Sequence, residues 1–321
     1  MSGKTTDAQV RYDWQIEEVL DLFNLPFNDL LFRSHLVLRE NFTPNQIQVS
    51  TLLNIKEGGC SENCGYCSQS AHNNSDVKAK PLMTVDDVKT AAQRAKDAGM
   101  TRLCMGASWR NPKERDMPEI ISIIKEVKKI GLQACMTLGM LTEEQAQTLK
   151  EAGLDYYNHN LDTSREYYSK VVTTRTFDDR LETLKYIRDA GISVCCGGIV
   201  GLGEDLFDRA SMLCTLANLP KHPDSVPVNM LVKLDGTPLS EVADVDHIDF
   251  VKMIAVARIV LPKSYVRLSA GRAEMSETTQ ALCFFAGANS IFYGDKLLTT
   301  DNASQRDDEQ MLAKLGLSIE R

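Results

Sequence analysis

The stretch that decides the fold reads MPEIISIIKEVKKIGLQACM and runs from Met117 to Met136. Residues 117–130 predict a helix, and Gly131 is the kind of residue that ends one. The next five residues, 132–136, predict a strand. Because this strand follows the helix across a single glycine, the unit is typical of a parallel sheet whose strands are connected by helices.

The same unit repeats along most of the chain. Further helices are expected over 84–98, 142–152, 177–190, 205–218, 247–261 and 276–287. The expected strands are 47–55, 101–105, 132–136, 155–158, 192–196, 225–231, 264–268 and 288–292. Eight strands with intervening helices predict an α/β fold, a (β/α)8 barrel of the TIM type. A doubly wound open sheet is the alternative, since periodicity alone does not exclude it.

Two extensions are expected to flank the barrel. Residues 1–46 form an N-terminal helical extension in this interpretation, because apolar residues recur at helical spacing over 14–40. The barrel itself is assigned to 47–300. Residues 301–321 make a polar C-terminal tail, in which 308–318 is a candidate short helix.

Composition indicates a cytoplasmic enzyme. The 321 residues are 43% hydrophobic and 25% charged, with a formal net charge of −8. No run of Lys or Arg exceeds two residues, which argues against a nucleic-acid partner. No apolar run approaches the roughly 20 residues of a membrane span. The nine cysteines are an odd number without a secretory leader, so they indicate metal ligands, catalytic groups or buried small residues in a reducing compartment.

Three of the cysteines form a compact motif, Cys60-Ser61-Glu62-Asn63-Cys64-Gly65-Tyr66-Cys67, directly after the first strand. A cubane iron–sulfur cluster held by three thiolates keeps one iron free for another ligand. The loop is also expected at the carboxyl end of the barrel strands, where active sites of this fold lie. A structural zinc site or an electron carrier is the alternative. Zinc ribbons, however, usually pair two C-x2-C knuckles, and ferredoxins supply four cysteines.

Three other cysteines align on the predicted strands. Cys104, Cys135 and Cys195 each fall near the end of a strand, four or five residues after a helix-ending glycine. If they point into the barrel together, they make a second soft-metal site. The alternative is that they are buried small hydrophobes. Cys196, Cys214 and Cys283 show no such alignment and are interpreted as core residues.

Three stretches at strand ends carry polar or glycine-rich residues. The segment 157–163 offers amides and a carboxylate for a small polar ligand, although a turn followed by a helix cap fits equally well, and its His159 is expected to be solvated. The glycines of 197–204 allow a backbone to approach a flat or anionic ligand. Arg267 lies inside an apolar strand and needs a partner, for which a buried carboxylate is the simplest choice.

The motif C-x3-C-x2-C with an aromatic residue before its last cysteine, Tyr66 in this chain, resembles the signature of the radical S-adenosylmethionine enzymes. Within that superfamily the chain is similar to the biotin synthase family from about Val49 to Thr300. The similar segments are 60–70, 104–109, 156–163, 197–204 and 265–272. The resemblance implies a homodimer of (β/α)8 barrels and a sulfurtransferase that inserts sulfur into dethiobiotin to form biotin.

The resemblance also implies two clusters. Cys60, Cys64 and Cys67 would hold a [4Fe-4S] cluster whose open iron chelates S-adenosylmethionine, and reduction would release a 5′-deoxyadenosyl radical that takes hydrogen from dethiobiotin. Cys104, Cys135, Cys195 and Arg267 would hold a [2Fe-2S] cluster whose bridging sulfide is the sulfur source. Arg267 enters this set from the resemblance alone, since a guanidinium is a poor metal donor.

Ligand contacts follow from the same resemblance. It implies that S-adenosylmethionine is contacted by Tyr66, Ala107, Trp109, Asn160, Asp162 and Ile199. It implies that dethiobiotin is contacted by Asn158, Asn160, Asn229, Thr299 and Thr300. A reducing, flavodoxin-like electron-transfer protein would be a partner. Two other hypotheses stay open: another small-barrel radical S-adenosylmethionine enzyme with a second iron–sulfur site, and a non-catalytic electron carrier or zinc-stabilised scaffold.

Overall fold

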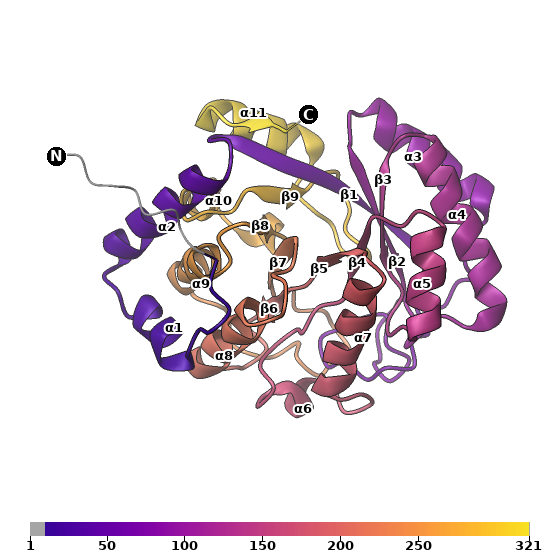
Figure 1. Cartoon of the computed structure of the whole chain (residues 1–321), viewed down its shortest axis with the longest axis horizontal. Helices are drawn as coiled ribbons and strands as arrows, with labels where there is room; N and C mark the ends of the chain where they lie inside the picture. The colour runs from indigo at the N-terminus through magenta and orange to yellow at the C-terminus, as the bar shows by residue number, and fades with distance from the viewer. Residues whose placement is uncertain (1–9, 321) are drawn as a thin grey trace.

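A computed structural model describes residues 10–320, and its centre is a closed barrel of parallel strands (Figure 1). The strands are β1 (Gln46–Lys56), β2 (Arg102–Ala107), β3 (Gln133–Thr137), β4 (Tyr156–Asn158), β5 (Ser193–Cys195), β6 (Gly198–Val200), β7 (Ser225–Met230), β8 (Tyr265–Leu268) and β9 (Ser290–Phe292). Strands β1 to β5 pair in this order, β5 and β6 both pair with β7, β8 and β9 follow, and β9 pairs back onto β1. This closure confirms the predicted (β/α)8 barrel and rules out the open sheet.

β5 and β6 together occupy one of the eight strand positions, because both pair with β7. The interruption between them lies next to Gly197, where the chain passes against Pro227 of β7. A Cβ atom at Gly197 would lie 2.0 Å from the Pro227 carbonyl oxygen, so only glycine allows this approach.

Helices cover the outside of the barrel (Figure 1). They are α3 (Val85–Asp97), α4 (Met117–Lys129), α5 (Glu143–Glu151), α6 (Tyr168–Val171), α7 (Phe177–Asp189), α8 (Leu206–Ala217), α9 (His247–Val260) and α10 (Glu277–Phe285). Several begin at a Thr, Ser or Asp whose side chain accepts a backbone N–H of the first turn, as Thr142 does from Gln145. Within residues 10–320, none of the helices combines the length and apolar character that a membrane crossing needs.

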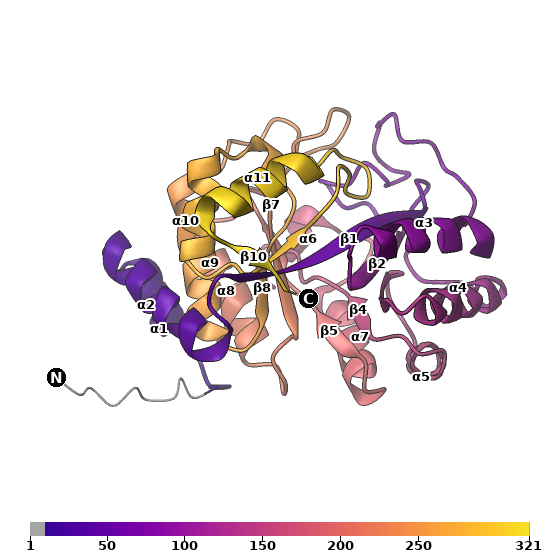
Figure 2. The ribbon, with the colours of Figure 1, turned by 90° about the horizontal axis from the view of Figure 1, so that it is seen from above.

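The residues predicted to be helical at 14–40 form α1 (Ile16–Phe23) and α2 (Phe27–Asn41). Residues 1–9 of the predicted extension lie outside the described part of the chain. α1 and α2 lie against α8 and α9 in both views (Figures 1 and 2). This second layer explains why α9 is apolar on nearly all sides, with Ala255, Val256 and Ala257 in succession fully buried.

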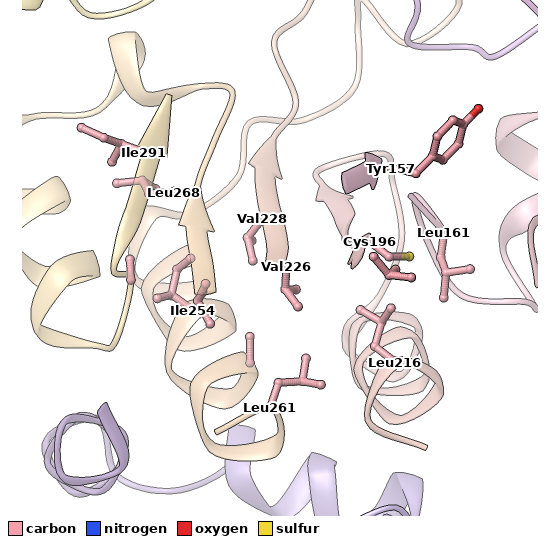
Figure 3. Packing of buried hydrophobic residues seen from close by; sticks show 14 of the residues in the cluster. Tyr157, Leu161, Cys196, Leu216, Val226, Val228, Ile254, Leu261, Leu268 and Ile291 are labelled. Carbon is pink, nitrogen blue, oxygen red and sulfur yellow. The ribbon is translucent and has the colours of Figure 1, made fainter. Parts of the chain in front are cut away.

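The core lies between the barrel and its helices. Outward-facing strand residues such as Val226, Val228 and Leu268 pack toward Ile254 and Leu261 (Figure 3). Side chains of a strand alternate between its two faces, so the residues between them point into the barrel. The inward-facing residues include the polar side chains that were predicted for the site.

The C-terminal segment contributes to the fold more than a polar tail would. The candidate helix at 308–318 is instead α11 (Gln305–Leu315), which ends where Gly316 adopts a left-handed φ of 67°. The strand β10 (Ser318–Ile319) follows and pairs in parallel with the start of β1 (Figure 2). Asp308 on α11 accepts two hydrogen bonds from Arg272, at 2.8 and 2.7 Å, and both side chains are completely buried.

Asp308→Ala is expected to lower the free energy of unfolding by about 3–5 kcal/mol, because it leaves the Arg272 charge buried without its partner. Urea denaturation followed by circular dichroism measures this loss. The double substitution Arg272→Met with Asp308→Leu should recover most of it, since both charges are then gone. A single-variant loss below about 1 kcal/mol, the size expected for an exposed pair, would show that water reaches this site.

Candidate active site

The cysteine loop is held in shape by its own backbone. The Cys60 N–H donates to the Gln69 carbonyl at 2.9 Å, and the Asn73 side-chain amide donates to the carbonyls of Cys64 and Cys67 at 3.0 and 2.8 Å. Gly58 enters the loop with a left-handed φ of 65°, and a Cβ there would lie 2.8 Å from the Lys78 carbonyl oxygen. The three thiols therefore project from a loop whose conformation is fixed in advance.

The thiols of this loop fit an iron–sulfur cluster. All nine cysteines are free, and burial raises the pKa of Cys64 to about 11 and that of Cys67 to about 12. Coordination reverses this preference, because a metal-bound thiol is deprotonated. Within residues 10–320, no three His, Cys, Asp or Glu side chains are placed to hold a single metal ion. A cluster is wider than an ion, and it is this larger group that three thiols on one loop suit.

A cavity of 260 Å³ opens at the carboxyl ends of the strands, beside the cysteine loop. Its lining brings together Tyr66, Cys67, Asn158, Asn160, Asp162, Ile199, Asn229, Thr299 and Thr300, which all belong to the predicted site. Ala107 and Trp109 are not part of the lining. The apolar part of the wall includes Leu231, Leu234, Leu297 and Leu298 from two loops, and nothing in the sequence singled these residues out.

Hydrogen bonds to neighbouring groups of the chain fix the asparagines of the cavity. Asn229 donates to the Gly198 carbonyl at 2.9 Å and accepts the Ala270 N–H at 3.2 Å. Asn160 accepts the Gly197 N–H at 3.1 Å. Asn158 donates to the Thr137 hydroxyl at 3.2 Å. These side chains are oriented before any ligand arrives, which limits the entropy lost on binding.

Asp162 lies at the cavity wall with a left-handed φ of 70°. Its Oδ2 atom accepts the Tyr66 hydroxyl at 3.0 Å and the Arg180 Nη2 at 2.5 Å. Because both donors use Oδ2, Oδ1 is the carboxylate oxygen that can accept a hydrogen bond from a ligand hydroxyl.

The glycine-rich stretch does less than its sequence suggested. Glu204 turns back on it and accepts the N–H groups of Gly201 and Leu202, at 3.0 and 2.7 Å. These two amides are therefore engaged by a carboxylate of the chain itself and are not open to a ligand. Ile199 alone connects the stretch to the cavity.

The second set of cysteines is gathered inside the barrel. Cys104 of β2 and Cys135 of β3 are direct neighbours in the strand register, and Cys195 is on β5. All three are buried. Cys104 and Cys135 lie in the middle of their strands and not near the ends, since β2 and β3 run on to Ala107 and Thr137. A hydrogen bond from Cys135 lowers the pKa of Cys104, and the same bond raises the pKa of Cys135.

Arg267 points into the same interior and has neutral partners. Its Nε donates to the Ser290 hydroxyl at 2.9 Å, and its Nη2 donates to Gln48 Oε1 at 3.1 Å and Ser50 Oγ at 3.3 Å. Among residues 10–320, no carboxylate forms an ion pair with it, so a buried salt bridge is not the reason for its presence. A fully buried cation without a carboxylate fits thiolates or an anionic cluster as its counter-charge.

His159 differs from its expected solvated state. Only 1% of it is exposed, and burial holds its pKa well below the usual value. The sequence also gave no sign of Arg175 and Arg180, which donate to the same Tyr168 hydroxyl at 3.1 and 3.0 Å behind the cysteine loop. Their roles depend on contacts between distant segments, and no local pattern marks them.

Comparisons with known proteins agree with this architecture. Residues 56–213 match the family described as the Radical SAM superfamily, and 227–318 match the family described as the Biotin and Thiamin Synthesis associated domain. Among solved structures, methylornithine synthase (PylB) superposes with a TM-score of 0.81 at 20% identity, covering 97% of this chain and 95% of its own. The FeFe-hydrogenase maturase HydG of Carboxydothermus hydrogenoformans gives 0.83 at 18% identity, covering 96% and 76%. These two similarities concern the fold.

Curated relatives are much closer in sequence. Biotin synthase of Marinobacter nauticus is 57% identical over 98% of this chain and 90% of its own length. That of Methylococcus capsulatus is 58% identical over 98% and 97%, and that of Pseudomonas putida is 58% identical over 100% and 91%. With this identity along nearly its whole length and with both family domains present, the chain belongs to the biotin synthase family of the radical S-adenosylmethionine superfamily.

Proposed function

We infer that this protein inserts sulfur into dethiobiotin to form biotin, using S-adenosylmethionine. The observation that carries the proposal is the stacking of its sites along the barrel. Cys67 lines the cavity from the loop above. Leu52, Thr137 and Ser269 line it from the strands, and each lies two residues after Ser50, Cys135 or Arg267 of the interior set. The cavity is thus one inward-facing layer above the second thiol set.

The two sets of ligands have separate roles in this proposal. Cys60, Cys64 and Cys67 would hold the [4Fe-4S] cluster, which when reduced supplies the electron that cleaves S-adenosylmethionine. Cys104, Cys135, Cys195 and Arg267 would hold the [2Fe-2S] cluster, which supplies the sulfide that becomes the sulfur of biotin. A substrate in the cavity would lie between the two, where neither reactive group meets bulk water.

The residues of the chain itself bind and orient. Asp162 Oδ1 and Asn160 would hydrogen-bond to the ribose hydroxyls of S-adenosylmethionine, with Tyr66 beside them. Asn158 and Asn229, with Asn160, would contact dethiobiotin through their side-chain amides. Thr299 and Thr300 belong to a loop that is tied to the cysteine loop, because the Thr299 and Ser68 hydroxyls hydrogen-bond at 3.1 Å. From this loop, Thr299 and Thr300 line the cavity and would contact dethiobiotin.

The partners and the location of the protein are also proposals. We expect a homodimer that takes electrons from a flavodoxin-like protein in the cytoplasm. The nine free thiols suit such a reducing compartment.

Anaerobic reconstitution followed by turnover tests the proposal. The protein should bind about six irons per chain, four and two in the two clusters, and should form biotin and 5′-deoxyadenosine from dethiobiotin, S-adenosylmethionine and a reductant. About four irons with cleavage but no biotin would indicate another radical S-adenosylmethionine enzyme. Zinc without iron would contradict the proposal entirely.

A further inference from the structure

The segment that precedes α7 is bound along its length to the cysteine loop. The Gly65 N–H donates to the Val171 carbonyl at 2.9 Å. Asn63 Oδ1 accepts the N–H groups of Thr173 and Thr174, at 2.9 and 3.2 Å. The next residue, Arg175, is therefore held in a fixed place relative to the three thiols.

Arg175 is buried and directs its guanidinium at a thiol. Its Nη2 donates to Cys64 Sγ at 3.2 Å, and its Nε donates to the Tyr168 hydroxyl at 3.1 Å. Its side chain is only 6% exposed. The contact with sulfur is shorter than either contact that this guanidinium makes with a carboxylate.

Carboxylates near Arg175 are farther away than the sulfur. Glu62 Oε1 lies 3.8 Å from Nη1 and Asp162 Oδ2 lies 4.0 Å from Nη2, and neither is within hydrogen-bond distance. Each carboxylate has a closer basic partner, Arg110 for Glu62 at 3.3 Å and Arg180 for Asp162 at 2.5 Å. The Cys64 sulfur is therefore the nearest partner for the positive charge of Arg175 that has no closer basic partner of its own.

We propose that Arg175 is a positioning residue that aligns Cys64 and makes the cluster of the cysteine loop easier to reduce. The inference rests on the proposed function only in taking Cys60, Cys64 and Cys67 as cluster ligands. Accepting one electron adds one negative charge to a thiolate-ligated cluster. A fixed buried cation hydrogen-bonded to a ligand sulfur stabilises the more negative state, and hydrogen bonds to sulfur are a known determinant of cluster potentials.

The test is a redox titration that does not depend on turnover. Full-length wild type, Arg175→Gln, Arg175→Lys and Tyr168→Phe are reconstituted anaerobically, assayed for iron and sulfide, and titrated without S-adenosylmethionine while electron paramagnetic resonance follows the reduced four-iron signal. Tyr168→Phe is the matched control, because it removes the shared acceptor of Arg175 and Arg180 but leaves the bond to sulfur.

At the wild-type midpoint potential, Arg175→Gln should lower the ratio of reduced to oxidised cluster by about ten-fold, as expected for the loss of one charge-assisted hydrogen bond. Arg175→Lys keeps the positive charge but lacks the planar guanidinium with its several N–H donors. It should lower the ratio of reduced to oxidised cluster less than Arg175→Gln does. Tyr168→Phe should leave it unchanged. If the glutamine variant assembles no cluster, the lysine variant decides, and a ratio equal to that of wild type overturns the inference.

An unchanged ratio in fully loaded Arg175→Gln would also overturn it, as would an equal fall in Tyr168→Phe, which would assign the effect to general loosening. These outcomes leave the proposed function intact. A wild-type protein that binds no iron at the cysteine loop would instead overturn both proposals together.

Discussion

Cys67→Ala is expected to abolish the reductive cleavage of S-adenosylmethionine, and with it all biotin formation. The loop offers three thiolates, and the cluster needs all of them. Of the three, Cys67 is the one that also lines the cavity. Two remaining thiolates on one loop do not hold a four-iron cluster stably. The 5′-deoxyadenosine formed with an excess of strong reductant should fall by at least about 100-fold, more than the effect of losing an outer-shell partner.

Cys283→Ala is the matched control for this loss. Cys283 is a fully buried core cysteine on α10 and belongs to neither thiol set. Its removal should cost some stability through the small cavity left behind, but it should leave cleavage near the wild-type rate. Wild-type cleavage by Cys67→Ala would show that the cysteine loop is not the radical-generating site.

Cys135→Ala is expected to separate the two halves of the reaction: some S-adenosylmethionine cleavage remains while biotin formation is lost. Cys135 is next to Cys104 in the strand register and one layer below the cavity, so its substitution leaves the cysteine loop untouched. Bound iron should fall from about six to about four per chain. Parallel measurement of 5′-deoxyadenosine and biotin in single-turnover reactions checks both halves.

Cys196→Ala gives the sharpest control for the second set. It is adjacent to Cys195 in sequence but faces outward into the packing between strand and helix (Figure 3). Its loss should spare both iron and biotin formation. Should Cys135→Ala make biotin at the wild-type rate, the assignment of the interior cysteines as a second cluster site would be wrong.

Much of the fold could be predicted because the ends of helices and the positions of strands are marked by short stretches of sequence. A glycine ends several of the helices just before a strand, as Gly131 and Gly191 do, and each of the eight predicted strands is present. The break between β5 and β6 could not be predicted, because it comes from the contact of Gly197 with Pro227, 30 residues away in sequence. The pairing of β10 with β1 has the same origin in distant contacts.

The same distinction, between features marked by local sequence and features that depend on distant contacts, applies to the site. The cysteine loop and the interior cysteines are marked by spacing and by strand register, so the sequence was enough to group them. The neutral partners of Arg267, the burial of His159 and the closure of the glycine-rich stretch by Glu204 required the folded chain. Each depends on which side chains the barrel brings together, and a single sequence does not state that.

The first strand has a consequence for how far apart the two reactive centres lie. On its inward face, Gln48 and Ser50 contact Arg267, Leu52 lines the cavity, and Asn54 donates to Gln69 of the cysteine loop at 3.0 Å. A strand rises about 3.3 Å per residue and resists stretching. The separation between the cysteine loop and the interior thiol set is therefore set by the covalent length of one backbone segment, and it does not depend on the conformation of the other loops around the cavity.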